Sequence, residues 1–179
     1  SIYIDHSGKI LATGFCSNDN LNFLATTGAY NTVLAGGQDI FVAKYKIENN
    51  VRELTAMTYL GGTGDDRAVA VRCDQDNNIY ISGYSDASNF PLVSSVQPAN
   101  NGGKDVVVAK FDSSLTELLY STYLGGKLDD IAYSMDVAEN GDAYITGVTS
   151  SNDYPTQNGE MNNYQGQEDA FLTKLVSSG

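Results

Sequence analysis

The sequence predicts an all-β protein built from three copies of one antiparallel unit, and three observations lead to this prediction. The chain has 179 residues, 41% of them hydrophobic, so it is long enough and apolar enough to bury a core. No segment keeps a helical spacing of apolar residues over three turns, and 18 Gly against three Pro suit short strands joined by tight turns. Three short motifs recur at a nearly constant spacing, which indicates an internal structural repeat.

The motifs define the repeated unit. Residues 58–66 read TYLGGTGDD and residues 122–130 read TYLGGKLDD, with seven of nine positions identical at a spacing of 64 residues. Two further motifs occur three times each: DIFVAK, DVVVAK and DAFLTK begin at Asp39, Asp105 and Asp169, and ILATG, IYISG and AYITG begin at Ile10, Ile79 and Ala143. These spacings divide the chain into blade-like units at residues 1–65, 66–129 and 130–179.

Each unit is predicted to form four short strands. In the second unit, segments rich in Val, Ile, Tyr and Phe run over residues 66–73, 79–85, 105–112 and 118–124. Polar turns join the first segment to the second and the third to the fourth, as in antiparallel hairpins, whereas the middle connection is long. Four antiparallel strands at a fixed period are typical of a propeller blade, although 64 residues exceeds the roughly 40 to 50 of common blades.

The strand count predicts a partial β-propeller. The first two units supply four segments each, whereas the third supplies three and lacks its outer strand. Closed propellers have roughly four to eight blades, so we expect further blades, either in a longer chain or in a partner chain. The segment Ala170–Leu175 would otherwise form an unpaired edge with an apolar face, which favours pairing with a partner strand.

The motifs together resemble a known family. YLGG followed by two Asp, a strand ending in ITG, a Tyr-Pro or Phe-Pro pair, and DAF followed by Lys are similar to the SBBP beta-propeller repeat of bacterial surface and secreted proteins. The first unit departs from this pattern, since Leu24 stands in place of the Pro, and Ala56 and Met57 in place of Tyr-Ser. The resemblance implies a propeller fold and an extracellular or cell-surface setting, and it implies no established catalytic residues.

Charge and composition exclude several classes of function. Ten Lys and Arg against 22 Asp and Glu give a net charge of −12, which argues against nucleic acid as a partner. The longest apolar runs hold four or five residues, so no membrane insertion is expected. His6 is the single histidine and lies in a turn at the end of the unit opposite the long loops, so we expect no enzyme activity.

One end of the predicted sheets carries the candidate ligand-binding residues. Consecutive connections of a meander alternate between its two ends, so the GGxxDD loops and the long loops share one end, and such loops commonly bind ligands. The candidates are acidic, amide or aromatic residues: Asp65, Asp66, Phe90, Asn100, Asn101, Asp129, Asp130, Tyr154, Asn162 and Tyr164. Exposed Tyr, Asn and Asp would suit glycans, and the adjacent Asp pairs at 65–66 and 129–130 would suit calcium, the one cofactor suggested.

A structural interpretation of the same residues is favoured because they recur in every copy. Paired Asp residues cap turns by accepting backbone amide hydrogen bonds, and an aromatic residue beside Pro fills the gap between blades. Asp74, Asp76 and Asn78 have the spacing of a calcium loop, but Ile79 stands where that loop needs Gly, so a polar hairpin turn is predicted. Cys16 and Cys73 are interpreted as two buried thiols, with a disulfide between adjacent blades as the alternative.

The sequence therefore favours a non-catalytic extracellular or cell-surface module that acts in structural assembly or protein recognition. Two alternatives remain open at this point. One is a carbohydrate-binding module that uses the acidic loop end. The other is part of a propeller hydrolase or lyase whose active site lies outside these 179 residues.

Overall fold

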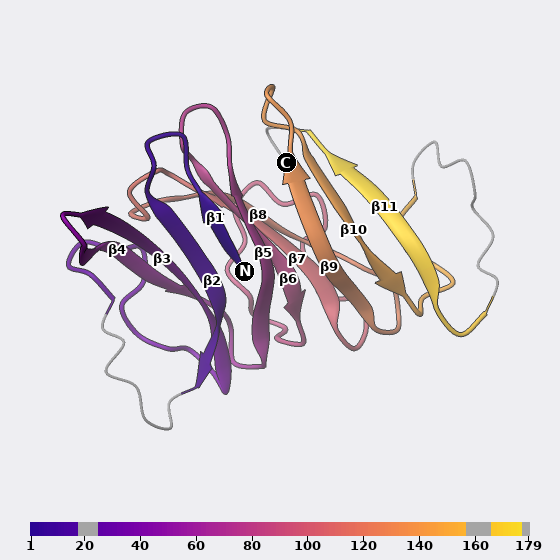
Figure 1. Cartoon of the computed structure of the whole chain (residues 1–179). Coiled ribbons are helices and arrows are strands. Elements are labelled where there is room, and N and C mark those ends of the chain that lie inside the picture. Colours follow the sequence, from indigo (N-terminus) through magenta and orange to yellow (C-terminus); the bar gives the residue numbers. More distant parts are fainter. Residues whose placement is uncertain (18–24, 157–165, 177–179) are drawn as a thin grey trace.

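The structure is a computed structural model, which describes residues 1–17, 25–156 and 166–176. Every regular element in them is a β-strand, and the strands form three antiparallel sheets (Figure 1). The first sheet contains β1 (Ile2–Ile4), β2 (Ile10–Ser17), β3 (Gln38–Glu48) and β4 (Val51–Leu60). The second contains β5 (Asp66–Cys73), β6 (Ile79–Ser85), β7 (Asp105–Phe111) and β8 (Leu118–Leu124), and the third β9 (Asp130–Val137), β10 (Ala143–Thr149) and β11 (Asp169–Leu175).

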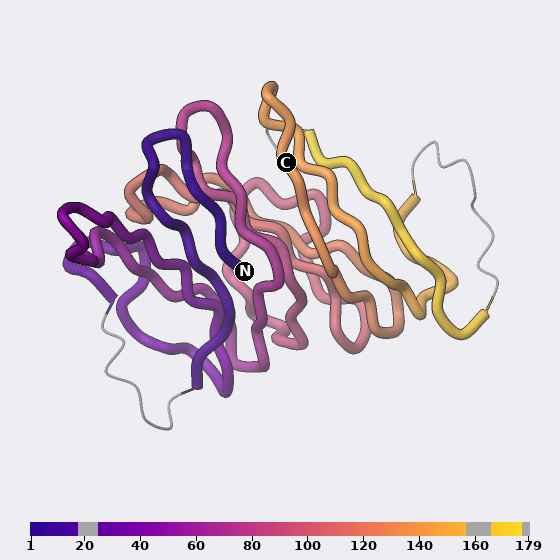
Figure 2. The backbone as a smooth tube through the Cα atoms, viewed as in Figure 1, coloured from indigo at the N-terminus to yellow at the C-terminus, as the bar shows by residue number. Residues whose placement is uncertain are grey.

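This architecture confirms the predicted all-β fold with four, four and three strands in its sheets. In the second sheet the strands begin where the sequence predicts them, and only β7 ends one residue earlier than expected. The turns after β1, β5 and β9 all lie at one end of the sheets, and the connections from one sheet to the next lie at the other (Figure 2). In the part of the chain that is described, no helix is long and apolar enough to cross a membrane.

The sheets pack face to face through two apolar layers. Leu11, Ile40 and Val42 of the first sheet meet Val71 and Phe111 of the second, and all five are fully buried. Beyond the second sheet, Tyr80 and Val108 pack against side chains of the third sheet such as Met135 and Ile145. Each sheet therefore has an inner blade-to-blade interface, which is the packing expected of consecutive propeller blades.

A β-bulge recurs in the first strand of the second and third sheets. The pairing of β5 with β6 shifts at Val69, and that of β9 with β10 shifts at Tyr133. Opposite each bulge stands the last residue of the ISG or ITG motif, Gly83 or Gly147. A Cβ at either glycine would collide with the main-chain carbonyl of the bulged strand, so only glycine fits there.

Candidate functional site

The GGxxDD loops join one blade to the next, and backbone amides in each loop bond to its second Asp. The amide of Gly62 donates to Oδ2 of Asp66 at 2.7 Å, and the amide of Gly126 donates to Oδ2 of Asp130 at 2.7 Å. Both aspartates are the first residue of a strand and are fully buried. These hydrogen bonds are those of the turn-capping interpretation.

The first Asp of each loop has other partners than the second. Oδ1 of Asp129 accepts a hydrogen bond from the amide of Lys104, in the long loop of the preceding blade, at 2.9 Å. The carboxylate of Asp65 lies 3.9 Å from the guanidinium of Arg67. Adjacent aspartates in the sequence therefore serve different neighbours and do not converge on one point.

The aspartate that does approach Asp66 comes from the preceding blade. Asp39 lies near the start of β3, and a Cβ on Gly61 would lie 2.8 Å from Cγ of Asp39 and 2.7 Å from Oδ2 of Asp66. The next junction repeats this arrangement, because a Cβ on Gly125 would lie 2.5 Å from Cγ of Asp105 and 2.8 Å from Oδ2 of Asp130. We call Asp39 with Asp66, and Asp105 with Asp130, the junction pairs.

The electrostatic surroundings of the junction pairs disfavour their charged forms. Burial, together with the charges of Asp39 and Asp86, raises the pKa of Asp66 to about 6, although hydrogen bonds from Ser85 and Gly62 act in the opposite direction. Burial and the charge of Asp130 likewise raise the pKa of Asp105 to about 6. Burial is also the main cause that raises the pKa values of Asp39 and Asp130.

The amides predicted in the long loop of the second blade take part in the loop's own hydrogen bonds. Nδ2 of Asn100 donates to the carbonyl oxygens of Ser85 and Gly103, at 3.1 and 3.2 Å. The amide of Asn101 donates to Oδ2 of Asp105 at 2.9 Å, and its side chain donates to the carbonyl of Gly125 at 3.3 Å. These residues hold the long loop against the blade junction.

The predicted aromatic residues pack into the apolar layers between the blades. Phe90 is buried in the first apolar layer, with its ring centroid 5.8 Å from that of Tyr123. Tyr154 stacks on Phe171 at 4.8 Å between ring centroids, and its hydroxyl lies 3.0 Å from Oγ1 of Thr173. This is the packing role that the recurring position favoured: Phe90 is buried, and Tyr154 is half-buried with one face on Phe171. Asn162 and Tyr164 lie outside the described residues.

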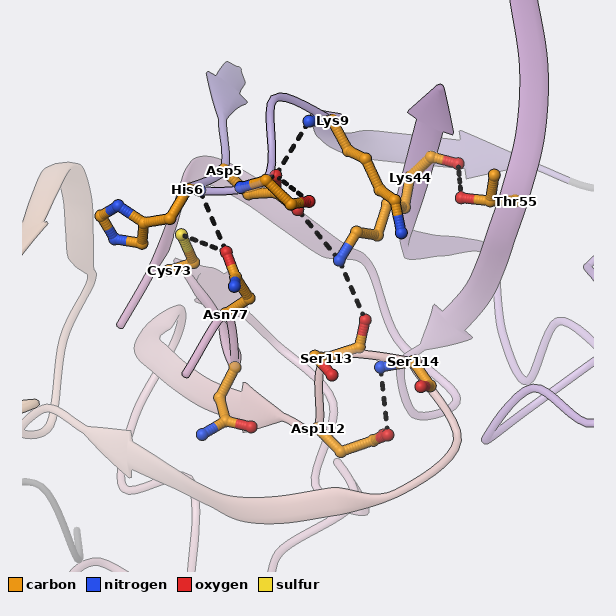
Figure 3. A network of polar contacts seen from close by, with 12 residues as sticks. Asp5, His6, Lys9, Lys44, Thr55, Cys73, Asn77, Asp112, Ser113 and Ser114 are labelled. Carbon is orange, nitrogen blue, oxygen red and sulfur yellow. Dashed lines mark hydrogen bonds and ion pairs between the residues drawn. The ribbon is translucent and has the colours of Figure 1, made fainter. Parts of the chain in front are cut away.

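The opposite end of the blades carries the hairpin turns, and these contain a second polar network (Figure 3). Asp5 accepts hydrogen bonds from the amides of Ser7 and Lys9, and its Oδ2 lies 3.0 Å from Nζ of Lys44. Nζ of Lys44 also donates to the carbonyl of Ser113 in the next blade at 3.1 Å, so this buried ion pair links two blades. Asp5 is 3% exposed, which leaves it no access to ligands in solvent.

The turn with calcium-loop spacing has the same design. Oδ1 of Asp74 accepts hydrogen bonds from the amides of Asp76 and Asn78, at 3.0 and 2.9 Å. Its Oδ2 lies 3.1 Å from Nζ of Lys110, so an ammonium group occupies the position next to this carboxylate. The polar hairpin turn predicted from the sequence is confirmed.

Two further predictions concern reactive side chains. Cys16 and Cys73 are both buried free thiols, as the sequence favoured, and burial together with the charge of Asp39 raises the pKa of Cys16 to about 11. His6 is exposed, and its backbone amide donates to Oδ1 of Asn77 (Figure 3). Within residues 1–17, 25–156 and 166–176, no three His, Cys, Asp or Glu side chains gather in a way that could hold a metal ion.

Comparison with known families agrees with this geometry. The family model of the SBBP beta-propeller repeat matches residues 57–91 and 119–155. Two segments of the chain are thus similar to the SBBP repeat. Each match begins within the outer strand of one blade and ends in the long loop of the next, so it contains one GGxxDD loop and the second member of a junction pair, Asp66 or Asp130. A search of curated proteins gave no match.

The sequence reasoning missed one member of each junction pair. Asp39 and Asp105 were recognised as the first residues of the DIFVAK and DVVVAK motifs but were not included among the site residues. The available signal was that this Asp is identical in all three motifs and stands at the same end of the blade as the GGxxDD loop. Its partner in the next blade is 27 or 25 positions away, at Asp66 or Asp130, so sequence neighbourhood does not reveal the contact.

Proposed function

We propose that this SBBP repeat chain is a non-catalytic structural module whose first and last blades pack against further blades of the same kind. One observation carries the proposal. Four apolar side chains on the outer faces of the first and third sheets, Ile2, Ile4, Tyr144 and Leu172, are exposed, whereas their repeat equivalents in the second sheet are buried between blades. The setting we propose is extracellular or at the cell surface, as the family resemblance implies.

The outer face of the third sheet repeats a surface that is covered in the second sheet. Val108 is 0% exposed and packs against the third sheet, whereas Leu172, 64 positions later, is 75% exposed. Tyr80 is 0% exposed, and its equivalent Tyr144 is 38% exposed. At the bulge, Val69 of the second sheet is partly buried against the third sheet, whereas its equivalent Tyr133 is 61% exposed. The outer face of the third sheet therefore exposes apolar side chains of the kind that are buried between the second and third sheets.

The outer face of the first sheet corresponds to the face of the second sheet that packs on the first. Val71 and Cys73 are 0% and 4% exposed because they face the first sheet. Their equivalents, 69 positions earlier, are Ile2 and Ile4, which are 75% and 66% exposed. The two outer faces are thus the two complementary halves of one interface, so an incoming blade can continue the stack at either end.

The outer edge of the third sheet supports the same conclusion. In the first two sheets the third strand pairs with a fourth, as β3 does with β4 and β7 does with β8. Within the described part of the chain, β11 pairs with β10 alone. Its free edge is open to a strand from a partner chain or from another part of the same protein. Head-to-tail contacts of this kind close into rings or extend into filaments.

The first test is the mass of the protein in its native source, by denaturing mass spectrometry, together with light scattering of the native particle. A denatured mass above that of the 179 residues, or a native particle larger than the denatured chain, is expected. A monomeric particle of 179 residues would overturn the proposal.

A matched pair of variants locates the contact. Leu172→Lys places a charge on the outer face of the third sheet, and Val96→Lys places one on a side chain that is 53% exposed in a loop. For an assembly of separate chains we expect Leu172→Lys to reduce the native particle and Val96→Lys to leave it unchanged. For a longer chain we expect Leu172→Lys to lower the unfolding midpoint, with Val96→Lys neutral. Equal effects of the two variants would argue against this face.

A further inference from the structure

The junction pairs combine complete burial with incomplete hydrogen bonding. All four carboxylates are 0% exposed. In each of them one oxygen is satisfied: Oδ2 of Asp39 by the amide of Ala35, Oδ2 of Asp66 by Gly62, Oδ2 of Asp105 by Asn101 and Gln97, and Oδ2 of Asp130 by Gly126 and Ser151. The other oxygen, Oδ1, is buried without a hydrogen-bond partner in all four. The same deficit at the same atom in two independent repeats points to a common cause.

Each pair shares one small space. A Cβ on Gly61 would touch both Oδ1 of Asp39 and Oδ2 of Asp66, so the unpaired oxygen of Asp39 faces the region that holds its partner carboxylate. A Cβ on Gly125 would likewise lie 2.5 Å from Oδ1 of Asp105 and 2.8 Å from Oδ2 of Asp130. The first glycine of each GG motif leaves this space open.

No Lys or Arg side chain in the described part of the chain forms an ion pair with a junction carboxylate. Across the described residues, the Lys and Arg side chains that form ion pairs do so with other acidic groups, and none reaches a junction carboxylate. Two buried carboxylates without a counter-charge are strongly disfavoured, so they require either a proton or a bound cation. Hard divalent cations take oxygen ligands from Asp side chains, backbone carbonyls and water, and calcium tolerates irregular geometry.

We propose that each junction pair binds one divalent cation of the calcium type between its two carboxylates, with backbone carbonyl oxygens and water completing the ligand shell. The chain then has two equivalent sites, one between each pair of consecutive blades. The ligands come from different blades, because Asp39 and Asp105 lie in β3 and β7, whereas Asp66 and Asp130 open β5 and β9. The cation would tie one blade to the next, which the sequence-adjacent pairs at 65–66 and 129–130 do not do.

The test measures calcium stoichiometry and thermal unfolding of the intact chain. After dialysis against buffered free calcium, we expect two calcium ions per chain by atomic absorption and a higher unfolding midpoint than in EDTA. Asp39→Asn and Asp105→Asn each remove one ion, because an amide keeps the shape and loses the charge. Asp65→Asn and Asp129→Asn are matched controls at the same two junctions and keep both ions.

Two results would overturn this assignment. Wild-type chain that binds no calcium at millimolar concentration, and whose midpoint is the same in calcium and EDTA, would show that protons neutralise the pairs. In that case Asp39→Asn would raise the midpoint at neutral pH. Loss of calcium from Asp65→Asn or Asp129→Asn, with Asp39→Asn unaffected, would place the ion on the adjacent aspartates instead.

Discussion

Replacing Gly83 by alanine is expected to destabilise the chain far more than the same change at Gly14, although both glycines end the same repeated motif. A Cβ at Gly83 would lie 2.8 Å from Cα of Ala68 and closer still to the carbonyl oxygen of Arg67, both in the main chain of the β5 bulge. A Cβ at Gly14 would meet only the ring of Phe41, 3.1 Å from its nearest atom. The Phe41 side chain can change its rotamer, whereas the bulge can move only if backbone hydrogen bonds between β5 and β6 break.

The magnitude follows from that difference. Overpacking against a fixed core costs about 1 to 3 kcal/mol, and each ladder hydrogen bond lost adds about 1 kcal/mol. We therefore expect Gly83→Ala to lower the free energy of unfolding by about 3 kcal/mol or more. Gly14→Ala should lie within about 1 kcal/mol of the wild type, because the reduced entropy of its unfolded chain offsets a mild contact.

Urea unfolding followed by far-ultraviolet circular dichroism measures both variants on one scale, provided that the slope with urea is the same as in the wild type. Gly147→Ala repeats the experiment in the third sheet, where the glycine faces the carbonyl of Ile131 across an equivalent bulge. Equal losses at Gly14 and Gly83 would refute the reasoning, since the bulge would then not be the cause.

Two further predictions concern side chains described above. In the isolated 179-residue chain, Tyr154→Ala should lower the free energy of unfolding by about 3 kcal/mol, because the ring packs on Phe171. Tyr133→Ala should change it by less than about 0.5 kcal/mol in the same chain, because Tyr133 is exposed there, and similar losses for both variants in urea titrations would contradict this. Burial alone would raise the pKa of Asp74, but Asn78 and Lys110 outweigh it and leave the pKa below 3.8. The stability it contributes is present above that value and is lost as the pH falls through the folded pKa, so the thermal midpoint should drop as the pH is lowered below about 4. Asp74→Asn should flatten that drop, and an unchanged slope would exclude this source.

The fold could be predicted because the same pattern of apolar and turn residues occurs three times. One alternating segment such as residues 79–85 is ambiguous alone, but its recurrence at 143–149 with the same flanking turns identifies both as strands. The topology then fixed which loops share an end of the blade. The bulge was not predictable, because Val69 and Tyr133 have no common side-chain chemistry, and the only trace of it is the glycine on the opposite strand.

The candidate site could be predicted only in part. Sequence placed Asp66 and Asp130 correctly at the loop end, and burial then separated them from Asp65 and Asp129, which differ in environment although adjacent in sequence. Pairing with Asp39 and Asp105 depends on how the sheets are rotated against each other. That rotation is set by apolar packing along the whole face, so no local motif encodes it.

The buried contacts between blades have a mechanical consequence. The second sheet is clamped on both faces, by the first sheet through Val71 and by the third through Tyr80, whose hydroxyl also donates to the carbonyl of Gly141 at 3.0 Å. The first and third sheets each pack against another sheet on one face only. A stack of this kind unfolds locally from its end sheets first, so amide protons in β6 and β7 should exchange last. If further blades were added, the sheet with the slowest exchange would lie elsewhere along the chain.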